Sequence, residues 1–329
     1  MFGFIVTFLG LSALILVHEL GHFAAAKFFG MRVDEFGIGF PPRLLSFSRG
    51  ETRYSLNSLP LGGFVRLHGE LDDAGDRSFT RYRFFPRAVV LLAGVFMNFA
   101  AGWLVFSAVF WIGFPAAVFV TDVMPGSPAE AAGIERGDMI AGFGDPAAFS
   151  AFVASASGSA VPFSVVRSGE AIPVAPALRA DPPPGEGSLG LVLSGGAAAP
   201  LGFLAAIARG FLAALSLSWA VISGLGSLFA QPESVVGPVG IFSIAIGTGH
   251  LGFVPVLELL GVISLNLAVL NLLPIPALDG GRLLFMAFEA VRRKKFAPHA
   301  EVRAHAAGFA LLMALVIFVT FKDVIRIFS

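Results

Sequence analysis

A His-Glu-x-x-His motif, from His18 to His22, lies inside an uninterrupted apolar stretch and constrains this chain more than any other feature. Between residues 1 and 29 the only charged residues are Glu19 and Lys27. Histidines at positions i and i+4 of a helix share one face, so both rings can bind one tetrahedral Zn²⁺. Glu19 follows the first histidine, where it can accept a proton from water at the metal. The motif predicts zinc-dependent peptide hydrolysis within a membrane, whereas two polar groups buried between helices are the alternative interpretation.

The composition is that of a polytopic membrane protein. Hydrophobic residues make up 56% of the chain and charged residues 13%, and the mean hydropathy is +0.83. The formal net charge is zero, which argues against a nucleic-acid partner. Because the chain has no cysteine, any metal must be bound by His, Asp or Glu. The N-terminal apolar run is too long for a signal-peptide core and lacks a charged start, so we expect a retained transmembrane helix.

Four segments are long and apolar enough to cross a bilayer, at about 4–28, 88–114, 254–277 and 304–321. The segment 116–195 differs, because it contains short β-rich runs separated by turn residues, and it predicts a small soluble domain. The expected fold is therefore a polytopic α-helical membrane protein with four transmembrane helices and one inserted α+β domain. Residues 1–115 and 254–329 form the two halves of the membrane core, and residues 196–253 form a membrane-associated linker.

Charge predicts the orientation of the spans. Lys and Arg number ten in residues 27–87 and six in residues 282–303, but only four in residues 114–254. The positive-inside rule places the first two stretches in the cytoplasm and the soluble domain outside. The uncharged segment 211–230 is long enough to span, but a single extra span would break this charge rule. We therefore expect it to lie on or dip into the outer leaflet, and two extra spans, the second at 235–253, are the alternative.

Asp279 is the best candidate for a third zinc ligand, since a catalytic zinc usually has three protein ligands and one open position. At 1.5 Å per residue, His18 lies roughly 20 Å from the outer end of its helix, in the cytoplasmic half of the bilayer. Asp279 follows the cytoplasmic end of the third span, where Pro274 and Pro276 break the helix and Gly280-Gly281 let the backbone turn. An ordinary exposed Asp at a helix end is the alternative.

The chain resembles the site-2 proteases, which are intramembrane zinc metalloproteases, and in particular their bacterial RseP-type branch. The resemblance rests on His18–His22, Leu278-Asp-Gly-Gly281, Pro60-Leu-Gly-Gly-Phe-Val-Arg66 and Gly237-Pro-Val-Gly-Ile241. It implies that His18, His22 and Asp279 bind zinc and that Glu19 is the general base. It further implies a bacterial inner-membrane location. The implied substrates are single-span membrane proteins already cut by another protease, such as anti-sigma factors or remnant signal peptides.

The first cytoplasmic loop predicts a β-hairpin. Residues 53–57 and 63–68 alternate like two strands, with Pro60-Leu-Gly-Gly63 at the turn. A helical substrate must unwind before its peptide bonds can react, and an exposed strand edge can pair with the unwound segment. The resemblance implies this role for a membrane-associated hairpin near Gly62, Gly63 and Phe64. A purely structural hairpin is the alternative.

Three asparagines lie in apolar helices, where buried amides need partners. The resemblance implies that Asn266 and Asn271 bind the substrate backbone, and helix packing is the competing interpretation. Four residues before Asn98 the family usually has Gly-Pro, whereas this chain has Gly94-Val95. That departure leaves the role of Asn98 open.

Residues 124–140 resemble the signature of PDZ domains in membrane proteases, with a helix starting at Ser127 or Pro128 and Gly133 ending it. PDZ domains accept extended peptides by strand addition, so extracytoplasmic peptides or substrate ectodomains are possible partners beside the lipid bilayer. The groove is either a peptide binder or a size filter. Two other functions stay open from sequence alone, an intramembrane zinc transporter and a non-catalytic PDZ adaptor.

Overall fold

The computed structural model describes residues 2–70, 75–113, 117–156, 160–167, 170–183, 186–195, 199–226, 237–249, 252–294, 296 and 298–328. Within them, five helices are long and apolar enough to cross a membrane. These helices are α1 (Phe2–Phe28), α2 (Phe84–Ile112), α5 (Phe203–Gly224), α8 (Phe253–Leu272) and α10 (Pro298–Phe328). The four predicted spans correspond to α1, α2, α8 and α10, and α5 is the additional long helix.

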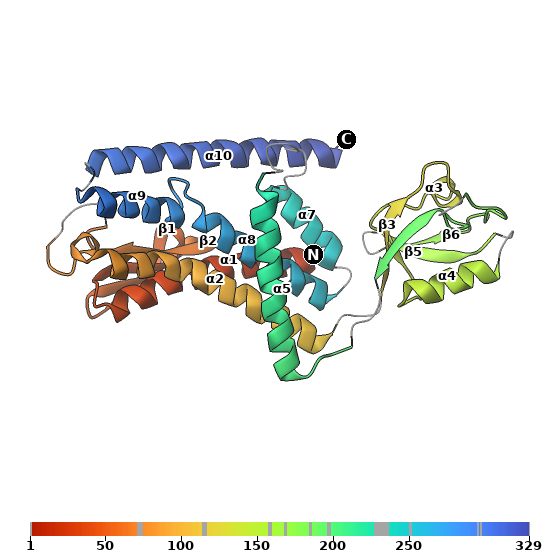
Figure 1. Cartoon of the computed structure of the whole chain (residues 1–329), viewed down its shortest axis with the longest axis horizontal. Helices are drawn as coiled ribbons and strands as arrows, with labels where there is room; N and C mark the ends of the chain where they lie inside the picture. The colour runs from red at the N-terminus through yellow and green to blue at the C-terminus, as the bar shows by residue number, and fades with distance from the viewer. Residues whose placement is uncertain are drawn as a thin grey trace.

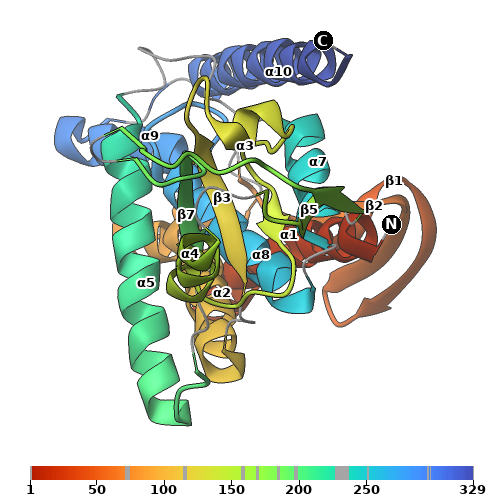
Figure 2. The ribbon, with the colours of Figure 1, turned by 90° about the vertical axis from the view of Figure 1, so that its right-hand side faces the viewer.

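Helix α5 runs across the others. Figures 1 and 2 show α5 at full length in both views, whereas α10 runs along the long axis in Figure 1 and is seen nearly end-on in Figure 2. The crossing is close, because a Cβ on Gly210 would lie 2.6 Å from the backbone nitrogen of Ser107 in α2. Trp103 Nε1 also donates to Ile207 O at 2.9 Å. The expectation that this segment does not span stays a prediction, and part of the predicted linker, residues 227–236, lies outside the described residues.

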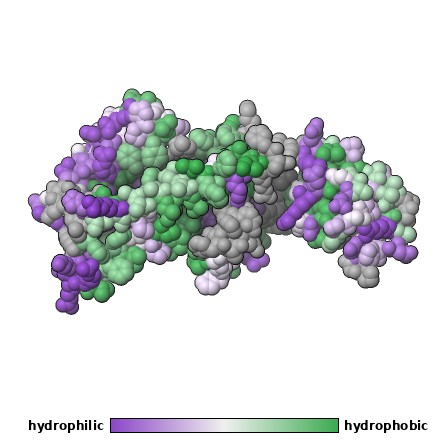
Figure 3. All heavy atoms as spheres, turned by 90° about the horizontal axis from the view of Figure 1, so that it is seen from above, coloured by the Kyte–Doolittle hydropathy of each residue, from purple (hydrophilic) through white to green (hydrophobic). Residues whose placement is uncertain are grey.

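Hydrophobic residues gather over the middle of the face covered by α10, and hydrophilic residues gather toward its ends (Figure 3). Many apolar side chains of α10 are exposed, including Phe309, Leu311, Ile317 and Phe318, which are about 60% exposed or more. An exposed apolar surface of this extent is unfavourable in water and is expected where lipid covers it.

The cytoplasmic loop forms a sheet from β1 (Val33–Arg49) and β2 (Thr52–Leu67), which join at a turn around residues 50–51. The predicted hairpin was wrong in its pairing, since residues 53–57 and 63–68 do not pair with each other. The β1 segment 35–38 lies between them and pairs with 53–56 on one side and 63–66 on the other. Each long strand supplies two segments to the sheet, and segment 63–67 lies along α1.

A second sheet is built by the strands that follow α2. Its order is β6-β5-β4-β3-β7, all antiparallel, from β3 (Val118–Val123), β4 (Met139–Ile140), β5 (Phe163–Arg167), β6 (Glu170–Val174) and β7 (Leu191–Gly195). Two helices, α3 (Pro128–Ala131) and α4 (Pro146–Ser155), accompany it. The Ser127 side chain accepts from Glu130 N, so α3 begins where the sequence predicted. The sheet lies at one end of the molecule (Figure 1).

The chain after α5 completes the membrane core. Helix α7 (Pro238–Gly249) precedes α8, and α8 ends at Leu272, before the two prolines that were expected to break it. The chain resumes as α9 (Asp279–Arg292). A short 3-10 helix, η1 (Phe79–Arg81), precedes α2.

Candidate active site

The structure brings His18, His22 and Asp279 together, although 256 positions separate the last two in the chain. Asp279 Oδ2 lies 3.0 Å from His18 Nε2 and 3.4 Å from His22 Nε2, and the two imidazole nitrogens are 3.1 Å apart. Both histidines are buried at 8% exposure. Three ligand atoms of the types that zinc prefers therefore converge at one point in the protein interior.

Two glycines allow the helices that carry this site to approach closely. A Cβ on Gly94 of α2 would lie 2.5 Å from His22 Nε2 and 2.7 Å from His18 Cε1, and a Cβ on Gly21 of α1 would lie 2.8 Å from Met97 Cγ. Small residues at such crossings let backbones pack directly within membranes. No role was expected for Gly94 from sequence, although a glycine in an apolar helix can indicate a close helix contact.

Helix α2 also supplies the groups that orient both imidazole rings. His22 Nδ1 is 2.7 Å from the carbonyl oxygen of Val90, to which it donates when its Nε2 is free to bind metal. Asn98 Nδ2 lies 3.2 Å from His18 Nδ1, and Asn98 Oδ1 has no hydrogen-bond partner among the described residues. With that oxygen turned toward the ring, Asn98 accepts from Nδ1 and leaves His18 Nε2 free for the metal. This contact answers the question that the sequence left open for Asn98.

The loop between α8 and α9 leads directly into Asp279 and places it close to His18 and His22. Gly280 and Gly281 follow Asp279, and both pack against backbone carbonyls of this loop. A Cβ at Gly281 would also lie 2.9 Å from Pro276 N. The break after Leu272 agrees with the sequence prediction. The turn was expected at Gly280-Gly281, but it lies at Pro276 and Ala277, and the two glycines belong to the first turn of α9. Their lack of a side chain permits the close approach to the loop carbonyls and does not make the turn.

Glu19 lies beside the three candidate ligands and contacts the loop sheet. Its Oε2 accepts a hydrogen bond from the backbone N–H of Val65 at 2.9 Å. A cavity of about 220 Å³ adjoins this contact and is lined by Glu19, His22, Phe64, Val65, Leu67, Glu70, Leu91, Ala277, Asp279 and Arg282. A carboxylate, a histidine and part of β2 thus line one cavity.

The Gly62-Gly63 pair fits the strand against α1, one turn before His18. A Cβ at Gly62 would lie 2.6 Å from Ile15 Cγ2, and one at Gly63 would lie 3.2 Å from Leu16 Cδ1. Gly62 also has a φ of 81°, a conformation that favours glycine. Of the three predicted substrate contacts in this loop, Phe64 lines the catalytic cavity, while the glycines bring the strand into place.

The structure does not place Asn266 or Asn271 on the lining of the cavity beside Glu19. The Asn266 amide donates to Val262 O of its own helix at 3.0 Å. Asn271 is half-buried in the last turn of α8. Their predicted contact with substrate stays a prediction.

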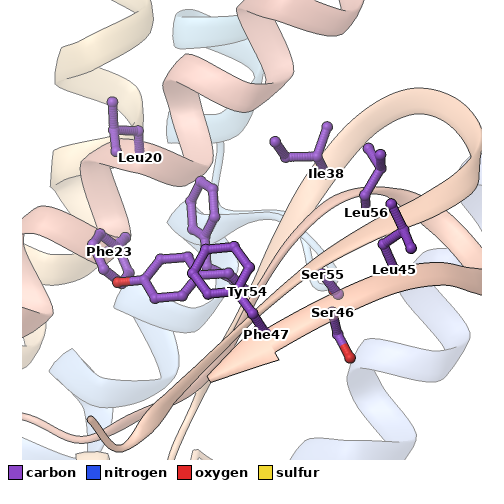
Figure 4. Close-up of a pocket in the computed structure, with 10 residues that line it drawn as sticks. Leu20, Phe23, Ile38, Leu45, Ser46, Phe47, Tyr54, Ser55 and Leu56 are labelled. Atoms are coloured by element: carbon purple, nitrogen blue, oxygen red, sulfur yellow. The ribbon is translucent and has the colours of Figure 1, made fainter. Parts of the chain in front are cut away.

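A second, larger cavity lies near this region but is not lined by the three candidate ligands. It measures about 460 Å³ and lies between α1 and the loop sheet, lined by apolar side chains such as Leu20, Phe23, Phe47 and Tyr54 (Figure 4). Leu20 projects from the side of α1 opposite His18 and His22, since it is two residues from each. Among the described residues that line this cavity there is no carboxylate, imidazole or amine.

The three converging side chains fit a bound zinc ion. Two imidazole nitrogens and one carboxylate form a three-residue donor set, and His22 and Asp279 also line the cavity beside Glu19. Asp279 Oδ2 is buried, and its nearest polar neighbours are the two imidazole nitrogens at 3.0 and 3.4 Å. A buried anionic oxygen of this kind needs a cation as its partner.

Comparison with known proteins gives one consistent match. A family model described as Peptidase family M50 matches residues 6–315. A protein of Clostridium perfringens that carries the name of a zinc metalloprotease is 34% identical over 333 residues, covering 98% of each chain. The zinc metalloproteases RasP of Geobacillus kaustophilus and Oceanobacillus iheyensis are 29% and 30% identical, covering 99% and 96% of this chain and 98% and 97% of theirs.

Proposed function

Since the chain belongs to peptidase family M50, the site-2 proteases, and is a bacterial zinc metalloprotease, we propose that it cleaves single-span membrane proteins within the bilayer. His18, His22 and Asp279 hold the zinc ion in this proposal, and Glu19 is the general base. The convergence of His18, His22 and Asp279 carries it. Family membership favours this function over a zinc transporter or a non-catalytic adaptor.

The reaction divides between the metal and Glu19. A zinc ion held by His18, His22 and Asp279 would supply the positive charge that polarises the scissile carbonyl and lowers the pKa of water. Glu19 accepts a proton from the attacking water and transfers it to the departing amine nitrogen when the C–N bond breaks. The Val65 N–H holds the Glu19 carboxylate at 2.9 Å. Val90 and Asn98 fix the ring orientations of the two histidines.

The segment 63–67 supports a strand-addition mode for the substrate. It pairs with β1 on one side and reaches Glu19 through Val65 on the other. An unwound substrate strand that pairs beside Phe64 and Val65 would enter the cavity lined by Glu19 and Asp279. Peptide bonds released from a substrate helix would then find partners where water is scarce.

The inserted sheet domain of residues 116–195 supports a PDZ assignment with a peptide groove. Strand β7 is the last in the sheet order, and a cavity of about 210 Å³ lies between it and α4. Phe149, Ser150 and Val153 line the α4 side, and Leu189, Gly190 and Leu191 line the strand side. An edge strand beside a helix is the geometry of strand addition, so we favour a peptide binder over a size filter.

The four-span arrangement would place this domain outside the cell and the β1–β2 sheet in the cytoplasm. The transverse α5 supports an even number of spans, and the cluster of Lys and Arg in residues 27–87 supports a cytoplasmic first loop. Substrates would be membrane proteins from which an outer domain has already been removed, such as anti-sigma factors or remnant signal peptides.

Two variants test the proposed site. Glu19→Gln should retain about one zinc per chain and lose cleavage of a single-span substrate by a factor of about 10³ or more. Asp279→Ala should lose both zinc and cleavage. Zinc content is measured by metal analysis of the purified membrane protein. Full zinc and normal cleavage in Asp279→Ala would remove Asp279 from the site, and undiminished cleavage in Glu19→Gln would remove Glu19.

A further inference from the structure

The last helix, α10, contacts the loop that carries Asp279. The backbone N–H of Ala277 donates to His305 Nδ1 at 2.8 Å. One turn further along α10, Gly308 packs on Pro276 so closely that a Cβ there would lie 2.6 Å from the Pro276 carbonyl carbon. Two residues one turn apart on α10 thus contact two adjacent residues of this loop.

Ala277 needs such support, because its φ is 84°. A residue with a Cβ seldom adopts a positive φ, and it does so only where the surroundings hold it. Ala277 lies two residues before Asp279 and lines the catalytic cavity. The direction in which the chain leaves Ala277 therefore determines where the Asp279 carboxylate arrives.

The contacts of His305 suit an acceptor in a fixed position. Nδ1 accepts from Ala277, so the proton of the neutral ring is on Nε2, which lies 3.9 Å from Glu301 Oε1. The ring also lies against Phe285 of α9, with 5.5 Å between ring centroids. His305 is thus oriented by α9, the helix that begins with Asp279.

From residue 309 to 318 most side chains of α10 are exposed. Near the far end of the helix, Asp323, 6% exposed, accepts a hydrogen bond from Gly240 N of α7 at 2.8 Å. Since much of the helix between faces outward, these two ends hold α10 to the core. Among the described contacts of α10, those at the His305 end reach the loop of Asp279 and the Asp323 contact does not, so Asp323 gives a matched comparison.

We propose that His305 is a positioning residue, which holds Ala277 in its strained conformation so that Asp279 reaches the zinc site. The inference rests on the proposed role of Asp279 as a ligand. It gives α10 a part in building the metal site, although α10 supplies no ligand.

The test compares zinc affinities in a chelator competition with purified full-length protein. His305→Leu removes the acceptor and should weaken zinc binding by about 10- to 100-fold. His305→Asn places Oδ1 where Nδ1 was and should bind zinc within about threefold of wild type. His305→Gln, whose acceptor is one bond further out, should not rescue. Gly308→Ala displaces Pro276 from the same helix and should weaken zinc binding as His305→Leu does.

The comparison variants separate positioning from general destabilisation. Asp323→Ala should lower the unfolding temperature of the protein and leave zinc affinity unchanged. Wild-type affinity in both His305→Leu and Gly308→Ala would overturn the inference, as would an equal loss in Asp323→Ala. If His305→Leu does not fold, His305→Gln against His305→Asn decides the question. If Asp279→Ala keeps its zinc, the proposed ligand set is wrong. If Asp279→Ala loses zinc but the His305 and Gly308 variants do not, the ligand set stands and only the inference about His305 is wrong.

Discussion

The Val65 backbone N–H and the Glu19 carboxylate are joined by a hydrogen bond of 2.9 Å, which links the loop sheet directly to the proposed general base. The strand that would pair with substrate is therefore the strand that holds Glu19. Movement of this strand should change both substrate binding and the position of the base.

Val65→Pro tests this link, because proline removes the N–H that Glu19 accepts. We expect cleavage to fall about 100-fold or more while zinc content is retained, since no ligand is touched. Single-turnover cleavage and metal analysis would be measured on the same preparation. Val65→Ala is the control, because it shortens the side chain and keeps the N–H. Equal activity in the Pro and Ala variants would show that this hydrogen bond does not matter to catalysis.

Gly94→Ala should strongly reduce the zinc content of the purified protein. The added Cβ would lie 2.5 Å from His22 Nε2 and 2.7 Å from His18 Cε1, so the rings or the helices must shift. Overpacking of this kind typically costs about 1–3 kcal/mol of stability. Leu92→Ala, an exposed position on the same helix, is the control and should keep full zinc. A fully zinc-loaded Gly94→Ala protein would contradict the close α1–α2 packing described above.

Features of the fold and the site that depend on residues close together in the chain could be predicted from the sequence, whereas contacts between distant segments could not. The helix face of His18 and His22 and the break at Pro274 follow from residue spacing and backbone chemistry, so they were predicted correctly. The pairing in the loop was not, because alternation identifies strands and not their neighbours, and segment 35–38 inserts between two segments that are closer in sequence. The contacts of Asn98 and His305 join distant helices, and a single polar residue in an apolar helix does not reveal its partner.

The pH dependence of the loop should follow Glu51. Hydrogen bonds from Lys27 Nζ at 3.0 Å and from the Arg77 guanidinium at 2.7 and 2.8 Å lower the pKa of Glu51 below its ordinary value of 4.5. A lowered pKa in the folded state means that the stabilisation is complete above the ordinary value and is lost as the pH falls through the folded value. Because the group is partly exposed, the effect should be about 1 kcal/mol or less.

Hydrogen exchange of residues 46–56, corrected for intrinsic rates, measures this local stability. Glu51→Gln should exchange faster than wild type at pH 7, and the difference should shrink below about pH 4.5. A difference independent of pH would show that the ionised carboxylate is not what ties the sheet to the end of α1.

The sidedness can be measured by cysteine labelling, since the chain contains no cysteine of its own. A cysteine at Ala148, exposed on α4, should react with a membrane-impermeant reagent added to intact cells. A cysteine at Arg49, exposed beside the turn of the loop sheet, should react only after permeabilisation. Labelling of both positions from the same side would contradict the four-span arrangement and the positive-inside assignment.

Cleavage should depend on helix-breaking residues in the substrate more than on side-chain identity. In hydrocarbon, each unpaired backbone donor or acceptor costs several kcal/mol, so an intact helix resists the unwinding that exposes its peptide bonds. Gly, Pro or Asn in the substrate lowers that cost, and segment 63–67 can replace the lost hydrogen bonds. We therefore expect a substrate whose helix breakers are replaced by Leu to be cut at least about 10-fold more slowly, with similar binding.

Phe64→Pro in the enzyme should slow cleavage of the Gly-containing substrate, because proline disturbs the strand that would pair with the substrate. If poly-Leu and Gly-containing substrates were cut at the same rate, unwinding would not limit the reaction, and strand addition at this edge should be abandoned.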